Sequence, residues 1–211
     1  MSREEAVKAI EVGISMVADL KEKGYNVLAT GEMGIGNTTT SSAVCSVLLD
    51  QSVEKVTGKG AGLTNKDLEH KIEVIKQSIA LNQVDANDPL DVLSKVGGLD
   101  IAGMVGCYIG GAALQVPVFI DGFISSVAAL IAIRLVPECA PYLFPSHCSN
   151  EPAGHLILDA IGKEPYILAN MCLGEGTGAV MGFTIADYAF KAYWELPSFE
   201  QTNFGTYEEL N

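Results

Sequence analysis

Two glutamates lie inside glycine-rich turns, where their carboxylates are well placed to do chemistry. Glu32 lies in the turn Gly31–Gly36, and Glu175 lies between Gly174 and Gly176. Glycine lets backbone N–H groups approach a ligand closely. A carboxylate in such a turn can act as a general base or pair with the nitrogen of a heterocycle. Spacing alone leaves a second interpretation of Glu175 open, in which its charge stabilises the N-terminus of the following helix.

A third carboxylate and one lysine complete the candidate set. Asp121 follows the apolar run Val116–Ile120, which predicts a buried strand. Polar residues at the carboxyl ends of strands lie in the ligand crevice of open α/β sheets, although Asp121 also suits the N-cap of a helix beginning near Phe123. Lys71 lies off the apolar stripe of a predicted helix that follows the glycine cluster Thr57–Gly62. It either reaches the group bound by that cluster or lies on a solvated helix face.

The glycine turns do not carry the common nucleotide-binding patterns. No lysine follows the glycines of the first turn as in a Walker motif, and Gly34–Thr39 departs from G-x-G-x-x-G. ATP hydrolysis and nicotinamide redox chemistry are therefore disfavoured. His147 and Cys148 lack a third catalytic partner, so hydrogen bonding in a loop is the favoured interpretation of His147. A phosphorylated sugar with a nitrogen base fits three glycine turns, a lysine and free carboxylates best.

The composition limits the kinds of molecule that the chain is expected to bind. The formal net charge of −13 argues against nucleic-acid binding, which depends on lysine and arginine. Only 18% of the 211 residues are charged while 48% are hydrophobic, which predicts a surface buried in a homodimer. Five scattered cysteines without C-x-x-C spacing and the lack of an apolar leader predict reduced thiols and a cytoplasmic protein. The apolar run Phe123–Val136 is too short to cross a membrane, and three widely spaced histidines predict no metal site.

The elements that must position these residues alternate between helix and strand. Ser2 and Glu5 predict a capping box at the start of the first helix. The predicted helices are 2–23, 41–48, 64–82, 90–96, 101–114, 123 onward and 180–194, and the predicted strands are 26–29 and 116–120. This alternation is typical of an α/β fold, a three-layer parallel sheet of Rossmann-like type with helices on both faces.

Five motifs occur in order along nearly the whole chain: Gly31–Thr39, Lys95–Asp100, Asp121–Ser125, Pro145–His147 and Leu173–Gly178. The series resembles the nicotinate-nucleotide–dimethylbenzimidazole phosphoribosyltransferase family of cobalamin synthesis. The resemblance implies that a nitrogen of 5,6-dimethylbenzimidazole attacks C1′ of nicotinate mononucleotide. Nicotinate then leaves and α-ribazole 5′-phosphate forms, without a metal or cofactor.

The resemblance also implies roles for single residues. Glu175 corresponds to the base that takes the benzimidazole proton, and Glu32 to a second active-site glutamate near the base and ribose. The expected substrate-binding residues are Gly60 and Lys71 at the 5′-phosphate, Asp121 near the ribose, Ser149 in a contact loop, and Asn37, Thr38, Gly122, Gly174 and Gly176 around the substrate.

Relatives in this family begin with a further segment that supplies part of the base pocket and of a small helical domain. We therefore expect an incomplete helical appendage, an exposed apolar face, a phosphoribosyltransferase core over residues 1–196 and a polar tail over 197–211. The chain is expected to be a truncated, split or fragmentary form. Two alternatives to an active enzyme are a remnant that binds a phosphorylated ribose or pairs with a separate N-terminal chain, and a dimeric interaction protein without a small-molecule site.

Overall fold

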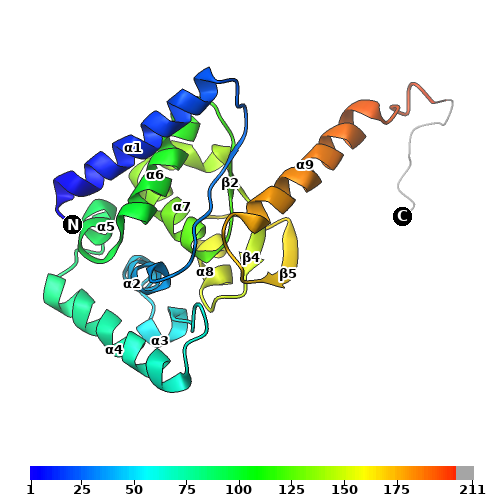
Figure 1. Cartoon of the computed structure of the whole chain (residues 1–211). Coiled ribbons are helices and arrows are strands. Elements are labelled where there is room, and N and C mark those ends of the chain that lie inside the picture. Colours follow the sequence, from blue (N-terminus) through cyan, green and yellow to red (C-terminus); the bar gives the residue numbers. More distant parts are fainter. Residues whose placement is uncertain (203–211) are drawn as a thin grey trace, which may run out of the picture.

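The computed structural model describes residues 1–202, in which helices and strands alternate (Figure 1). The α-helices are α1 Arg3–Glu22, α2 Asn37–Leu49, α3 Val53–Val56, α4 Asn65–Asn82, α5 Pro89–Val96, α6 Leu99–Ala113, α7 Phe123–Leu135, α8 Gly154–Ala160 and α9 Thr177–Glu195, and Pro137–Tyr142 is a 3₁₀ helix. The strands are β1 Leu28–Ala29, β2 Val118–Ile120, β3 Leu143–Pro145, β4 His147–Ser149 and β5 Ile167–Met171. Residues 203–211, most of the predicted tail, lie outside the described residues.

The described strands form two small parallel sheets, one in the order β1-β2-β3 and one of β4 with β5. Gly111 of α6 lies against Val118 on one face of β2. On the other face, the ring of Phe119 packs on Phe183 of α9 with 4.9 Å between centroids. Helices therefore cover both faces of a parallel sheet, and the predicted α/β class is confirmed, although its strands are divided between two sheets.

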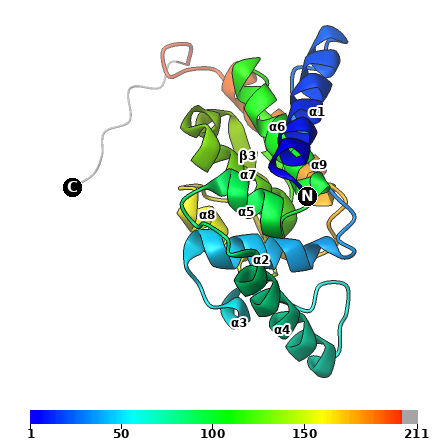
Figure 2. The same ribbon diagram turned by 90° about the vertical axis from the view of Figure 1, so that its left-hand side faces the viewer.

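Close backbone packing joins α1 to α6, which lie side by side in Figures 1 and 2. A side chain at Gly13 would overlap the backbone of α6 at Gly103 and Gly106, so glycine is required at this crossing. The predicted capping box of α1 is present. Val7 of α1, next to the buried Ala6, is 38% exposed. The buried face is centred on the small residues that allow the close approach to α6.

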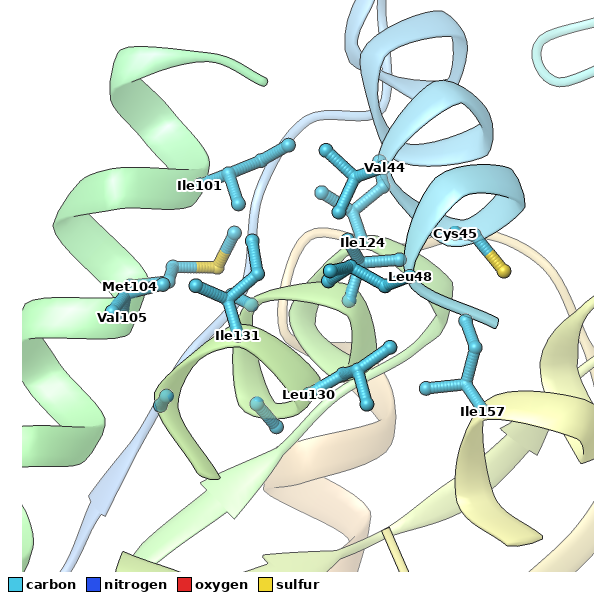
Figure 3. Packing of buried hydrophobic residues seen from close by; sticks show 14 of the residues in the cluster. Val44, Cys45, Leu48, Ile101, Met104, Val105, Ile124, Leu130, Ile131 and Ile157 are labelled. Carbon is cyan, nitrogen blue, oxygen red and sulfur yellow. The ribbon is translucent and has the colours of Figure 1, made fainter. Parts of the chain in front are cut away.

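The hydrophobic core lies between α2, α6, α7 and α8 (Figure 3). Val44 and Leu48 of α2 face Ile124 of α7 there, and Ile157 joins them from α8. Burying each such aliphatic side chain contributes about 1.5–3 kcal/mol. This core holds α2 and α7 in place, and each of these helices begins directly after a turn that follows a strand.

Besides the 3₁₀ helix, five elements were not predicted from the sequence: α3, α8, β3, β4 and β5. Residues 147–149 were interpreted as a loop, but His147 pairs with Ile167 across the second sheet. The strand-end position of Ser149 is thus fixed by pairing with a segment about twenty residues further along the chain. Among residues 1–202, no helix has both the length and the apolar character needed to cross a bilayer.

Candidate functional site

The two glycine turns that hold the glutamates are in direct contact. The backbone N–H of Glu175 donates to the carbonyl oxygen of Glu32 at 2.7 Å. A side chain at Gly31 would overlap the backbone of Gly176. Glu175 itself has a φ of 58°, in the left-handed region that residues with a side chain rarely adopt. The turn after β1 and the turn before α9 therefore form one structural unit.

Asp121 fixes that unit from the end of β2. Its Oδ1 accepts hydrogen bonds from the backbone N–H groups of Gly178 at 2.8 Å and Ala179 at 3.2 Å, and its Oδ2 accepts from Gly176 at 3.1 Å. Asp121 is 1% exposed. The prediction that Asp121 caps the helix beginning at Phe123 is wrong, because Asp121 caps α9, whose own N-cap is a glycine without a side chain.

His147 lies under the same turn. It is 3% exposed, and its Nδ1 shares a hydrogen bond of 3.1 Å with the hydroxyl of Ser146. The imidazole lies where a side chain at Gly178 would be, so this position must be glycine. Burial lowers the pKa of His147, although the nearby Asp121 carboxylate raises it. His147 therefore supports the start of α9, in line with its interpretation as a hydrogen-bonding residue.

A cavity of about 350 Å³ opens beside these turns. Its lining residues come from the turns after β1, β2 and β4, from the second glycine cluster and from the turn before α9. They are Glu32, Met33, Gly34, Thr38, Gly60, Ala61, Asp121, Gly122, Phe123, Ile124, His147, Ser149, Glu151, Cys172, Leu173 and Gly174. The three glycine turns noted in the sequence thus converge on one cavity.

Glu32 is the carboxylate most affected by this environment. Burial raises its pKa, and Asp100 and Asp121 raise it further, while hydrogen bonds from Asn37 and Gly34 lower it. The Asn37 amide donates to Glu32 at 2.6 Å and to Asp100 at 2.8 Å. Asn37, expected to bind substrate, therefore also orients the Glu32 carboxylate.

Glu32→Gln is expected to raise the thermal unfolding temperature at pH 8. The raised pKa means that the folded chain binds this proton more tightly than the unfolded chain. The stability gained by protonation is therefore present at low pH and is lost as the pH rises through the folded pKa. Glutamine stays neutral and still accepts from Asn37. Thermal unfolding of both proteins should show a difference at pH 8 that shrinks toward the ordinary glutamate pKa of 4.5. A destabilised variant at pH 8 would contradict this.

Lys71 is not on a solvated helix face, since it is only 7% exposed. Its ammonium donates to the Thr38 hydroxyl at 2.9 Å and to the Gly58 carbonyl at 3.1 Å. Burial lowers its pKa, and the Glu151 carboxylate raises it. Lys71 does not itself line the cavity but lies behind Thr38 and Gly60, which do. The interpretation as a solvated lysine is wrong, and the cation instead supports the wall formed by the second glycine turn.

Glu175 lies at a second, shallower depression. Gly31, Glu32, Glu175 and Gly176 line this depression, and Glu32 also lines the first cavity. The side chain of Glu175 is exposed. The two hollows therefore meet at Glu32. Glu175 lines the second depression, and the Gly60 turn lines the first cavity.

Most of the predicted site residues lie together. Those that line the first cavity are Glu32, Thr38, Gly60, Asp121, Gly122, Ser149 and Gly174, whereas Glu175 and Gly176 line the second depression. Asn37 and Lys71 contact lining residues from behind. Sequence reasoning missed Glu151, which has no glycine beside it, although its place two residues after Ser149 was a usable signal.

Comparison with known proteins shows which family the chain resembles. A family model described as phosphoribosyltransferase matches residues 1–204. The nicotinate-nucleotide–dimethylbenzimidazole phosphoribosyltransferase of Ruminiclostridium cellulolyticum is 53% identical over 210 residues, which cover all of this chain and 60% of that protein. The protein of the same name from Acetivibrio thermocellus is 52% identical over 99% of this chain and 59% of its own length.

A solved structure shows the same similarity. The crystal structure of CobT from Thermus thermophilus superimposes with a TM-score of 0.91 at 32% identity, over 97% of this chain and 61% of that chain. The chain thus spans about 60% of the length of the relatives that it matches.

Proposed function

Because the chain belongs to the phosphoribosyltransferase family whose model matches residues 1–204, we propose that it transfers the phosphoribosyl group of nicotinate mononucleotide to 5,6-dimethylbenzimidazole. The products are nicotinate and α-ribazole 5′-phosphate, a precursor of the lower ligand of cobalamin. One observation carries the proposal. Glu32 lines both the cavity that contains the Gly60 turn and the depression that contains Glu175.

In this proposal the nucleotide spans the two hollows. Its phosphate lies near Thr38 and Gly60 with Lys71 behind them, and its C1′ lies near Glu32. A benzimidazole nitrogen attacks C1′, and the electron pair of the broken C–N bond leaves with nicotinate, which is a good leaving group from a cationic pyridinium. Glu175 takes the proton from the other ring nitrogen of the benzimidazole. Nicotinate release that depends on added dimethylbenzimidazole tests the proposal.

Asp121 takes a different part in this proposal from the one implied by the resemblance. Both of its oxygens accept hydrogen bonds from backbone N–H groups of the turn before α9. It therefore positions Glu175 by holding that turn. Because Asp121 also lines the cavity, the ribose can still lie close to it.

A second candidate function is binding of a phosphorylated ribose without turnover. It is supported by the position of Glu175, which does not line the cavity that contains the Gly60 turn. Calorimetry with nicotinate mononucleotide, with and without dimethylbenzimidazole, separates the two functions. Binding without product formation supports the second, and product formation excludes it.

The proposal includes a cytoplasmic homodimer. Apolar side chains on α9 support the dimer, because Val180, Tyr188, Phe190, Tyr193 and Trp194 are each at least 60% exposed. Light scattering of the intact chain should give about twice the mass of 22.3 kDa. A monomer mass at micromolar concentration would exclude this part of the proposal.

A further inference from the structure

Glu151 is an acidic residue in the wall of the first cavity. It lines this cavity together with Thr38, Gly60 and Ser149. Its Oε2 is buried and has no hydrogen-bond partner within residues 1–202. The same oxygen occupies the space that a side chain at Gly58 would need. A buried acceptor without a partner costs free energy, so its presence in a cavity wall requires an explanation.

The charges at this end of the cavity are nearly balanced. Lys71 is the buried cation, and it already donates to Thr38 and Gly58. Burial raises the pKa of Glu151, whereas Lys71 and a hydrogen bond from the backbone N–H of Gly60 lower it. Burial lowers the pKa of Lys71, and Glu151 raises it. A dianionic phosphate bound against Thr38 and Gly60 would lie beside the Glu151 carboxylate. Two negative groups in a partly buried site repel each other, and sharing one proton removes the repulsion.

We propose that Glu151 selects a phosphoryl group that carries a proton, and that it accepts this proton in a hydrogen bond from a phosphate oxygen. The inference rests on the proposed function for the location of the phosphate. No covalent bond changes: the monoanion of the ligand brings the proton, since the second pKa of a phosphate monoester is about 6. A hydrogen bond between an O–H group and a carboxylate is short and strong. Sulfate has the same shape but no proton to donate at neutral pH.

The other charged groups near the cavity already have hydrogen-bond partners or are exposed to solvent. Asp121 accepts from three backbone N–H groups, and Glu32 accepts from Gly34 and Asn37. His147 is bonded to Ser146, and burial lowers its pKa. Lys59, in the turn before Gly60, is exposed. Among the described carboxylates, Glu151 is the one with a buried oxygen that lacks a partner.

Calorimetric titration of the intact chain with inorganic phosphate and with sulfate at pH 7 tests the inference. The unaltered chain should bind phosphate about 10- to 100-fold more tightly than sulfate, the effect of one hydrogen bond to a charged group. Glu151→Gln should bind both anions with similar affinity, because an amide does not repel a dianion and can donate to it. Gly58→Ala, whose added methyl displaces the carboxylate, should also reduce the preference. Asp159→Asn removes an exposed charge on α8 and should leave the preference for phosphate unchanged.

Two results would overturn the role of Glu151. One is equal affinity of the unaltered chain for the two anions, and the other is a preference that persists in a Glu151→Gln variant with unchanged thermal stability. A parallel titration with ribose 5-phosphate separates this failure from failure of the proposed function. If ribose 5-phosphate binds without the preference, only the role of Glu151 is wrong. If neither ribose 5-phosphate nor phosphate binds, the proposed phosphate site is wrong, and the inference is wrong with it.

Discussion

Glu175→Gln is expected to slow nicotinate release by about 10²- to 10⁴-fold, the usual contribution of a general base. The amide keeps the size of the side chain but cannot accept the benzimidazole proton. The backbone N–H of residue 175 still donates to the Glu32 carbonyl, so the turn should keep its shape. Initial rates with saturating nicotinate mononucleotide and dimethylbenzimidazole measure the effect.

A variant at the other end of the same helix tests whether the loss of a negative charge at a distance would by itself slow the reaction. Glu195 is exposed at the last position of α9, and Glu195→Gln should leave the rate unchanged. Binding of nicotinate mononucleotide to Glu175→Gln should change little, since the proposed phosphate position lies in the first cavity, which Glu175 does not line. Undiminished turnover in Glu175→Gln would show that another group is the base.

Asp121→Asn is expected to lower both stability and activity. The new amide nitrogen would face at least one of the three backbone N–H groups that Asp121 now accepts. Losing hydrogen bonds to a buried charged acceptor should lower the free energy of unfolding by about 2–3 kcal/mol. Displacement of the turn that carries Glu175 should lower turnover by about 100-fold. Urea unfolding and the nicotinate assay measure the two effects.

Asp187→Asn is the matched control for this variant. Asp187 lies on the same helix, is exposed, and pairs only with Lys191 at 2.8 Å among the described residues. A surface pair contributes about 0–1 kcal/mol, so stability and turnover should change little. If Asp121→Asn behaved like Asp187→Asn, Asp121 would not be what holds the turn before α9.

Local chemistry explains which elements the sequence predicted correctly. The N-cap of α1 at Ser2 and that of α4 at Thr64 depend on residues three positions away, and both capping boxes are present. The apolar run before Asp121 became β2, which is buried throughout. Such signals lie within a few residues of one another, so they are readable without a structure.

The missed features depend on distant partners. Lys71 is buried because it reaches Thr38, which is 33 positions away in the chain. Asp121 caps a helix whose bonded N–H groups lie 55 to 58 positions further on. Nothing in the spacing around either residue specifies these partners. The ordered series of motifs predicted that the glycine turns share one site, whereas only the structure reveals that Glu32 lies where two hollows meet.

The most direct test of the proposed transfer is product formation by the unaltered chain. Nicotinate mononucleotide is incubated with the chain, with and without 5,6-dimethylbenzimidazole, and both products are quantified by chromatography with mass detection. We predict that nicotinate and α-ribazole 5′-phosphate appear in equal amounts, only when both substrates are present, and far faster than with Glu175→Gln. Binding of the nucleotide with no product above the Glu175→Gln background would contradict the proposed transfer by this chain.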